Sequence, residues 1–597
     1  MCGILGQIEV HQPISEGQFR TQLNSLTHRG PDGEGLWLSP DKRVALGHRR
    51  LSFVDLSQAA AQPIADVEQT VWLTCNGEIY NAPELRQQLS ALGHRFRSQS
   101  DNEVILHGYK AWGAAGVLGR LKGMFAFGLW DAQNQQLLLA RDRFGIKPLY
   151  YTADREGLSF ASELKAFVGS RFPLRLRKAA ISEYLTYRYI PSPGTIYQGF
   201  FKLKPGHYLT WKPGEQVHTH QWYSPQVDDQ WLHPDEAALR VEELLRKSVA
   251  QHLTSDVELG SFLSGGYDSS ALACLMTESG AKPQVFSIGF QGWAQSEDHY
   301  AAQVAEKLGL NQHVHRLGLE DYTTLSRLAE VYDEPIADIS ILPTYAVSQL
   351  ARREVKGVFS GEGADEIFAG YHWHRDYMQF TAALAPVQKF VLRLAPQFFQ
   401  RSPLACGSRY AQYMAMGLFD EDRLDKTLTP EYTQARAADP FWFYRQHARP
   451  ELHPLQQMQW LDLHTFMPEL ILVKMDRASM ANSLEVRVPF LDHELVNFML
   501  GLHPSVYFRW NTPKSLLHKY LKGRVPNSIL QRKKQGFVGP DAYYAQPEPY
   551  RKELPNGALI QQGILRPEAL NKLLNEPDTH WHLWKLLVLE HWVRRWL

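Results

Sequence analysis

The sequence has few cysteines, no excess charge of either sign and no long apolar run. Its 597 residues include four cysteines (Cys2, Cys75, Cys274, Cys406), too few and too scattered for a disulfide framework or a four-cysteine zinc site. Lysine plus arginine and aspartate plus glutamate both number 63, so we expect no nucleic-acid partner. No run is long enough to span a membrane, and the first residues form no secretion signal. We therefore expect a cytoplasmic protein without a membrane partner.

The composition is that of a folded globular protein, with 44% hydrophobic and 21% charged residues. The length allows two large domains. Alternating apolar patches such as Thr70–Thr74 and Gln136–Ala140 predict a strand-rich first part. From Pro234 onward, helical patterns alternate with short apolar strands, which is typical of a doubly wound, mostly parallel sheet.

The central motif is Ser264–Ser270 (S-G-G-Y-D-S-S). It follows an apolar strand over Val257–Leu263 and precedes a helix over Ala271–Met276. Glycines that expose backbone N–H groups, serine hydroxyls and a helix N-terminus together favour phosphate binding. The lysine of a G-x-x-x-x-G-K-[ST] loop is missing, and Asp268 is suited to hold a magnesium ion on the phosphates. The alternative is an ordinary strand–helix turn.

A second glycine-rich turn, Ser360–Tyr371 (S-G-E-G-A-D-E-I-F-A-G-Y), follows an expected strand over Lys356–Ser360. It carries Glu362, Asp365 and Glu366. Clustered acids beside a nucleotide loop need cations to neutralise them, or serve to orient a reacting amine. The alternative is a solvated acidic turn.

The N-terminus begins Met1-Cys2-Gly3. Once Met1 is removed, Cys2 would carry a thiol nucleophile and a free α-amine, which can act as the general base for that thiol. The alternative is a small buried residue that happens to be second.

Three further features have simpler explanations. The pairs His218/His220 and His313/His315 lack accompanying metal-ligand spacing, so we interpret them as structural. The amphipathic run His582–Leu597 is expected to pack on its own domain or on a partner subunit rather than on a membrane.

These motifs together resemble one family. S-G-G-Y-D-S-S is similar to the pyrophosphate loop of enzymes that cleave ATP to AMP and pyrophosphate, especially the synthetase half of glutamine-hydrolysing asparagine synthetases, which usually have leucine at the position of Tyr267. The N-terminal segments resemble, in order and spacing, the N-terminal-nucleophile glutamine amidotransferase domain. These segments are Leu26–Gly35, Gly47–Asp55, Cys75–Asn81, Ser100–Leu106, Gly123–Asp131 and Ala140–Tyr151.

The resemblance implies the fold class and the domains. We expect an α+β N-terminal-nucleophile hydrolase domain, with two stacked antiparallel sheets between helices, over residues 1–215. An ATP-dependent synthetase domain of the α/β class, with a doubly wound sheet, would follow over residues 235–597.

The resemblance also assigns the glutaminase site. Cys2 would be the nucleophile, and Asn76 and Gly77 would form the oxyanion hole. Three residues would bind glutamine: Arg50 its α-carboxylate, Asp101 its α-amine, and Glu78 in support of the amine. The alternatives are a surface ion pair for Arg50 and Asp101, and a hairpin turn for Asn76–Gly77 that is compatible with the oxyanion role.

In the synthetase half the resemblance implies that Glu362 serves ammonia attack, that Lys534 meets the α-phosphate, and that Asp268 and Asp365 bind magnesium. Asp333–Tyr345 would border the acceptor. We expect Lys474, Asp476, Arg477, Glu485 and Arg487 to hold the fold through ion pairs. The expected ATP-binding residues are Phe262, Leu263, Ser264, Gly265, Gly266, Asp268, Ser269, Ser270, Ile288, Ser360 and Gly361.

The expected activity is ATP- and Mg²⁺-dependent amidation of a carboxylate by glutamine, with aspartate as the first candidate acceptor and a homodimer as a possible assembly. Tyr267, and Ile339 near the place where some aspartate-specific relatives have an arginine, leave the acceptor open. The alternatives are a sugar uronic acid or a natural-product precursor as acceptor, a ring-closing synthetase, and a silent scaffold. The presence of Cys2 together with Arg50, Asn76 and Asp101 argues against a ring-closing synthetase. The retained Asp268 and Asp365 argue against a silent scaffold.

Overall fold

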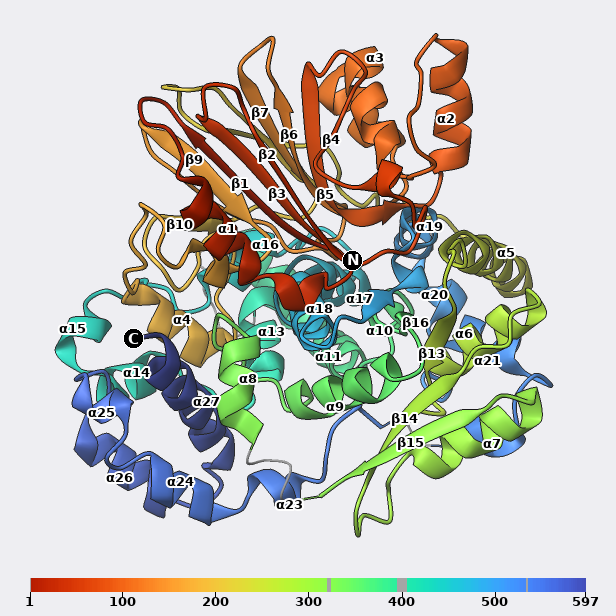
Figure 1. Ribbon diagram of the computed structural model, residues 1–597. Coiled ribbons are helices and arrows are strands. Elements are labelled where there is room, and N and C mark those ends of the chain that lie inside the picture. Colours follow the sequence, from red (N-terminus) through yellow and green to blue (C-terminus); the bar gives the residue numbers. More distant parts are fainter. Residues whose placement is uncertain (1, 319–323, 395–404, 533–534) are drawn as a thin grey trace.

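Two six-stranded sheets form most of the N-terminal third of the chain (Figure 1), and the computed structural model describes residues 2–318, 324–394, 405–532 and 535–597. Their strand orders are β10-β8-β9-β1-β3-β2 and β12-β11-β7-β6-β5-β4, and the paired strands are antiparallel. The strands are β1 (Gly3–Glu9), β2 (Gly33–Leu38), β3 (Val44–Arg50), β4 (Ile64–Ala65), β5 (Val71–Ile79), β6 (Gly123–Asp131), β7 (Gln136–Arg141), β8 (Tyr150–Ala153), β9 (Gly157–Ala161), β10 (Phe200–Lys202), β11 (His207–Trp211) and β12 (His218–Gln221).

Alternate residues of these strands point to opposite layers. Ile4 of β1 belongs to the apolar cluster between the two sheets, together with Ala126 of β6. Its neighbour Leu5 packs on the other face with Phe19 of α1 (Glu16–Asn24). On the second sheet, Phe125 of β6 faces the apolar side of α2 (Ala82–Ala91) and α3 (Glu103–Arg120). This sandwich of two sheets between helices confirms the predicted fold of the first part.

A five-stranded sheet organises the second part, with the order β15-β14-β13-β16-β17 and parallel pairing. From β13 the chain adds β14 and then β15 on one side. It then crosses over and adds β16 and β17 on the other side of β13, so the strand order reverses between β13 and β16. Ligands of open α/β sheets bind at the carboxyl ends of strands at such a switch point. The predicted parallel α/β domain is confirmed. Its strands are β13 (Leu259–Phe262), β14 (Val285–Phe290), β15 (Gln312–Leu317), β16 (Gly357–Phe359) and β17 (Glu485–Arg487).

Helices surround this sheet and extend beyond it into a helical layer near the C-terminus (Figure 1). A π-helical segment, Asp462–Ile471, joins α17 to α18. The helices after α3 are α4 (Ala179–Tyr187), α5 (Pro234–His252), α6 (Tyr267–Glu278), α7 (Asp298–Leu308), α8 (Leu325–Val331), α9 (Ile341–Arg352), α10 (Ala364–Ile367), α11 (His372–Leu394), α13 (Cys406–Met414), α14 (Glu421–Thr427), α15 (Pro430–Thr433), α16 (Trp442–His447), α17 (Pro454–Leu461), α18 (Leu472–Met480), α19 (His493–Gly501), α20 (Pro504–Tyr507), α21 (Ser515–Leu521), α22 (Asn527–Gln531), α23 (Asp541–Tyr544), α24 (Pro547–Glu553), α25 (Ala558–Gln561), α26 (Pro567–Asn575) and α27 (His580–Trp596).

The core is continuous across the two parts. One buried apolar cluster contains Leu5 and Phe19 from the N-terminal layers as well as Tyr332 and Trp592 from the C-terminal part. Helix α27 buries Leu583, Trp592 and other residues inside this cluster, so the predicted packing of the C-terminal run on its own chain is confirmed.

The structure excludes one alternative and differs from two local expectations. Asn76–Gly77 is no hairpin turn, because β5 runs straight through it and pairs with Phe125 and Ala126 of β6. The helix after the central loop begins at Tyr267 rather than Ala271, and the expected acceptor loop ends where α9 begins at Ile341. In the first case, pairing along a buried strand outweighs the local turn preference of Asn-Gly.

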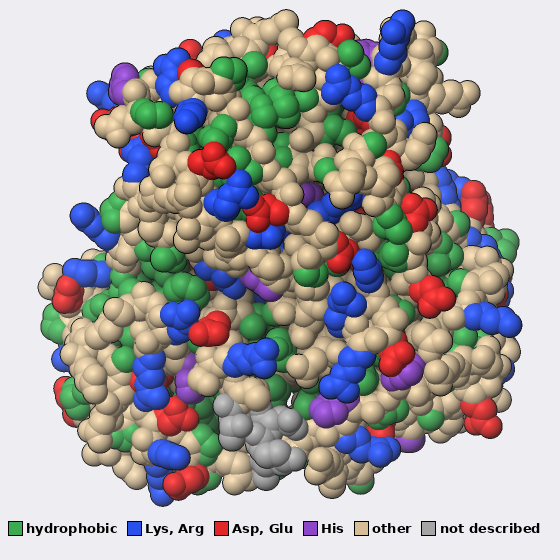
Figure 2. Space-filling model, in the orientation of Figure 1, with side chains coloured by type: hydrophobic (Ala, Val, Ile, Leu, Met, Phe, Trp, Pro, Cys, Tyr) green, Lys and Arg blue, Asp and Glu red, His purple; other side chains and the backbone are tan. Residues whose placement is uncertain are grey.

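The surface has mixed charge: Lys and Arg side chains lie interspersed with Asp and Glu over the face shown in Figure 2. Within the described ranges, the helices include none that is long and apolar enough to cross a membrane.

Candidate active sites

Cys2 is buried immediately before β1, between the layers of the N-terminal sandwich. Its main-chain N–H donates to Asn76 Oδ1 at 2.8 Å, and its Sγ lies 3.9 Å from the carbonyl oxygen of Leu51. Burial raises the pKa of the thiol, so a nearby base is needed to form the thiolate. The backbone pairing of β1 and the Asn76 side chain together fix the position of this cysteine.

Asn76 and Gly77 lie in the middle of β5. Asn76 is fully buried, and its Nδ2 finds no hydrogen-bond partner among the described residues. A buried amide donor without a partner is costly, and here it belongs to the same side-chain amide whose Oδ1 accepts the Cys2 N–H. At Gly77 a Cβ would approach Met124 O to 2.3 Å, so a side chain cannot fit. The strand therefore presents a free donor beside Cys2.

The predicted glutamine-binding charges lie near the same strand. Arg50 ends β3 and donates to the carbonyl oxygens of Ser57, at 2.9 Å, and Asp55. Asp101 accepts from the Ile79 N–H at 2.6 Å, which ties it to the end of β5. Burial raises the pKa of Asp101 to about 6.

Glu78 is also buried, and burial raises its pKa well above the ordinary value. Its nearest cation comes from the other part of the chain: Arg487 of β17 lies 3.7 Å away. Arg487 also pairs with Glu485 at 2.7 Å. Sequence reasoning did not anticipate this contact between the two halves.

The central loop turns from β13 into α6. Gly265 has φ +70°, and a Cβ there would approach the Tyr300 backbone to 2.6 Å, so glycine is required. Within the loop, the Ser264 N–H donates to Ser269 Oγ at 3.1 Å, and the Gly266 N–H to Ser264 Oγ at 3.2 Å. These N–H and hydroxyl groups, together with the first turn of α6, form a cradle for an anion.

The remaining predicted nucleotide residues flank this cradle. Phe262 ends β13, and the Leu263 N–H donates to the Phe286 carbonyl of β14 at 2.9 Å. Ile288 is buried in β14. Ser270 is buried in α6, and its Oγ finds no partner among the described residues.

The second glycine-rich turn follows β16 and touches the first. A Cβ at Gly361 would lie 2.9 Å from the Cβ of Asp268, so the two loops are in contact. The Ser360 N–H donates to Arg487 O at 2.9 Å, and the Ser360 hydroxyl donates to Glu362. Burial raises the pKa of Glu362. The sequence therefore predicted correctly that the two turns lie together.

Asp268 and Asp365 converge on a residue that the sequence did not reveal. Lys514 Nζ lies 2.5 Å from Asp268 Oδ2 and 2.7 Å from Asp365 Oδ1. Burial alone would lower the pKa of Lys514, but the two carboxylates raise it above its ordinary value. A lysine in the segment T-P-K-S looks like any solvated lysine, so no sequence pattern marks it. The loop itself contains no lysine, as the sequence shows, and this distant residue supplies the cation instead.

Two further predictions concern cations. Within the ranges that the structure describes, no three His, Cys, Asp or Glu side chains are grouped to hold a metal ion. The two carboxylates at Lys514 Nζ nevertheless form a donor pair that suits a Mg²⁺ ion whose other ligands are phosphate oxygens and water. Lys534 lies outside the described residues.

Three of the residues expected to hold the fold through ion pairs, Lys474, Asp476 and Arg477, form such contacts. Asp476 binds Arg29 at 2.8 Å, Arg477 binds Glu163 at 3.0 Å, and Lys474 lies 3.6 Å from Asp338. Arg29 and Glu163 belong to the N-terminal part, so these pairs cross between the two halves.

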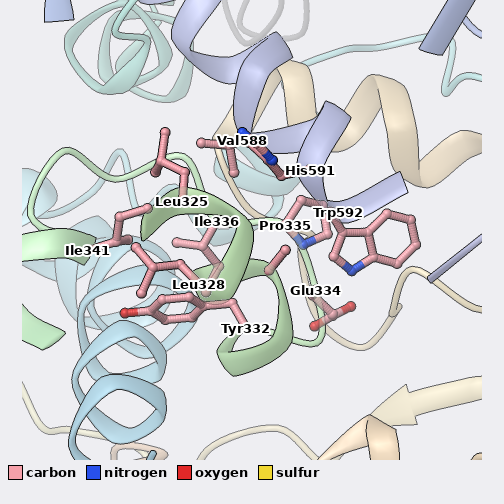
Figure 3. Close-up of a pocket in the computed structure, with 11 residues that line it drawn as sticks. Leu325, Leu328, Tyr332, Glu334, Pro335, Ile336, Ile341, Val588, His591 and Trp592 are labelled. Carbon is pink, nitrogen blue, oxygen red and sulfur yellow. The ribbon is translucent and has the colours of Figure 1, made fainter. Parts of the chain in front are cut away.

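A pocket lies between α8, the segment that leads to α9, and α27 (Figure 3). Its walls are mostly apolar, and four of its lining residues belong to the segment Asp333–Tyr345 that the resemblance places beside the acceptor. It is lined by Leu325, Leu328, Ala329, Tyr332, Glu334, Pro335, Ile336, Ile341, Val588, His591 and Trp592.

In comparisons with known proteins, the first and second parts of the chain match two different families. Residues 1–223 match the glutamine amidotransferase domain family, and residues 240–594 match the asparagine synthase family. The chain is 31% identical to a glutamine-hydrolysing asparagine synthetase of Bacillus subtilis, over 99% of this chain and 96% of the relative. It is 28% identical to an amidase of Gibberella zeae, over 91% of this chain and 90% of that protein.

A solved structure, the glutamine phosphoribosylpyrophosphate amidotransferase of B. subtilis, matches 52% of this chain and 65% of its own with a TM-score of 0.29 and 19% identity. The matches to the two family models and to the full-length relative show that the chain belongs to the asparagine synthase family, with a glutamine amidotransferase domain at its N-terminus.

Proposed function

We propose that this glutamine-hydrolysing, asparagine synthetase-type ligase converts aspartate to asparagine through an acyl-adenylate, with AMP and pyrophosphate as the other products. Residues 1–215 would release ammonia from glutamine, and residues 235–597 would activate and amidate the acceptor. The membership of the asparagine synthase family and the likeness to the Bacillus relative support the amidation.

In the first half, the Cys2 thiolate would attack the side-chain amide of glutamine. The α-amine of Cys2, freed by loss of Met1, would take the thiol proton. Asn76 Nδ2, which has no other partner among the described residues, and the Gly77 N–H would stabilise the oxyanion. Ammonia would leave, and water would then hydrolyse the glutamate thioester. Arg50 and Asp101 would hold the two ends of the amino acid.

In the second half, the acceptor carboxylate would attack the α-phosphate of ATP, forming the acyl-adenylate and releasing pyrophosphate. The Ser264–Ser270 cradle would hold the pyrophosphate. Asp268 and Asp365 would hold Mg²⁺, which offsets phosphate charge when bound. Lys514, fixed between these acids, would add a donor to the phosphates, and Lys534 would meet the α-phosphate. Ammonia, with Glu362 beside it, would displace AMP and form the amide.

The observation that carries this proposal is the meeting of Asp268 and Asp365 at Lys514 Nζ, because it places the acids of both loops at the switch point of the sheet. The test is AMP release with glutamine, ATP and Mg²⁺ and a panel of carboxylates, aspartate first. AMP release that depends on aspartate and yields asparagine is expected.

A second candidate is the same chemistry on another carboxylate, such as a sugar uronic acid or a natural-product precursor. The similarity to a fungal amidase over 91% of the chain favours keeping it. In the same assay it predicts AMP release with another member of the panel and none with aspartate.

A further inference from the structure

The hydroxyl of Tyr267 links the central loop to a separate helix. Tyr267 begins α6, and its OH donates to the carbonyl oxygen of Leu530 at 2.6 Å. Leu530 lies in α22, which has only five residues. The last four carbonyls of a helix have no partner within it, so a donor from outside must satisfy them. Here a residue of the Ser264–Ser270 loop supplies one.

Arg532, immediately after α22, also binds the same loop. Its NH1 donates to the carbonyl oxygens of Gly265, at 3.2 Å, and Ser264, at 3.4 Å. The guanidinium also pairs with Glu297 and stacks 4.4 Å from the ring centre of Tyr300. The end of α22 is therefore fastened to the loop at two points, one through Tyr267 and one through Arg532.

These carbonyl contacts orient the amides that would meet an anion. In a planar trans peptide the C=O and the next N–H point in opposite directions. With the carbonyls of Ser264 and Gly265 directed at Arg532, the N–H groups of Gly265 and Gly266 point away from it. The Gly266 N–H lies on the same side as Ser264 Oγ, which it meets at 3.2 Å. Arg532 thus sets the direction of two donors in the cradle.

We propose that Tyr267 is a positioning residue of the nucleotide site: its hydroxyl fixes the end of α22, and through it Arg532, against the phosphate loop. The inference rests on the proposed function, since it assigns the cradle to the phosphates of ATP. Leucine, the usual residue of the family at this position, has no hydroxyl to donate. This chain therefore has a link that the common motif lacks.

The test compares two tyrosine hydroxyls whose hydrogen bonds attach opposite ends of α6 to neighbouring helices. Tyr267→Phe removes the bond to Leu530 at the loop. Tyr520→Phe removes the bond from Tyr520 OH to Glu278 Oε2, 3.1 Å long, at the far end of the helix. For Tyr267→Phe the KM for ATP should rise about two- to tenfold, the effect of one hydrogen bond, while kcat changes less. Glutamine hydrolysis in both variants, and the KM for ATP in Tyr520→Phe, should equal those of the unmodified protein.

Calorimetric titration of each protein with MgATP measures ATP binding directly. It distinguishes a specific effect of Tyr267 on ATP binding from a general effect on α6. Weaker binding by Tyr267→Phe alone supports the inference. Equal ATP binding and equal KM in Tyr267→Phe and the unmodified protein would overturn it, as would equal losses in both variants, which would indicate a general effect on α6. If the unmodified protein binds no ATP, the proposed function fails, and the inference fails with it.

Discussion

The carbonyl oxygen of Cys2 accepts a hydrogen bond from Arg29 Nε at 3.1 Å. The same guanidinium donates through NH1 and NH2 to Asp476 of α18, at 2.8 and 3.0 Å. One buried cation thus joins the backbone of the proposed nucleophile to a helix of the synthetase half. Glu163 binds both Arg29 and Arg477, and Arg477 reaches Asp333, so the buried pairs continue toward the expected acceptor loop.

Arg29→Gln should destabilise the protein strongly. The Arg29 side chain is fully buried, and the change leaves Asp476 without its cation in an environment of low dielectric constant. Breaking such a pair by removing one partner costs about 3–5 kcal/mol. The free energy of unfolding from denaturant titration measures it, and glutamine hydrolysis should fall as well because the support of Cys2 is lost.

The matched control is Arg43→Gln. Arg43 pairs with Asp41 at 2.7 Å, but both side chains are about half exposed. An exposed pair contributes less than about 1 kcal/mol. Similar stability losses in the two variants would contradict the structural role assigned to Arg29.

Cys2→Ala should separate the two halves functionally. In the proposed mechanism glutamine hydrolysis requires the thiol, whereas the synthetase site uses ammonia, so amide formation from ammonium should remain. Glutamate release and acceptor-dependent AMP release, measured on the same preparation, give both rates. If the folded variant lost ammonium-dependent synthesis too, the halves would not act as independent sites.

Activity should also depend on removal of Met1. Because the proposed general base is the α-amine of Cys2, active protein should begin at Cys2, which intact-mass measurement can establish. A full rate of glutamine hydrolysis by protein that retains Met1 would exclude this mechanism.

The motifs could be predicted from the sequence because each is a contiguous segment whose chemistry is local. Ser264–Ser270 lies at a strand–helix turn, and its glycines and helix start were visible in the order of residues. Lys514 was not visible, since it lies 246 positions from Asp268 and only the folded chain brings them together. The contact between Arg487 and Glu78 likewise depends on the packing of the two halves. Asn76–Gly77 shows the opposite error, a local turn signal overridden by a long strand pairing.

The pH dependence of glutamine hydrolysis should report Asp101. Burial raises the pKa of this carboxyl to about 6, and in the proposed site its ionised form would bind the α-amine of glutamine. As pH falls below about 6, kcat/KM should therefore drop, toward tenfold per pH unit. In the complex the bound ammonium favours the ionised form, so the titration of Asp101 should be absent from kcat. A constant kcat/KM from pH 5 to 7 would exclude this role.

The same shift affects stability with a definite sign. The pKa of Asp101 is higher in the folded protein than the ordinary value near 4, so the folded state holds a proton that the unfolded state releases between about pH 4 and pH 6. Its contribution to the free energy of unfolding should decline as pH rises through that window. In Asp101→Asn this part of the pH dependence should disappear from thermal unfolding curves.

Asp268→Asn should stop adenylate formation and leave glutamine hydrolysis intact. The substitution keeps the shape of the side chain but removes one of the two charges that meet at Lys514 Nζ. The remaining carboxylate, Asp365, cannot by itself fix a cation on the pyrophosphate, so pyrophosphate release should fall by orders of magnitude. Cys2 lies in the other half and should release glutamate at a comparable rate.

Asp235→Asn is the matched control, because Asp235 pairs with Lys519 at 2.7 Å on the exposed surface of the same half. It should change neither rate. Pyrophosphate and glutamate release, measured together in both variants, give the comparison. Near-normal pyrophosphate release by Asp268→Asn would mean that Asp268 only shapes the turn and orients Lys514, and the assignment of the central loop to ATP would then be wrong.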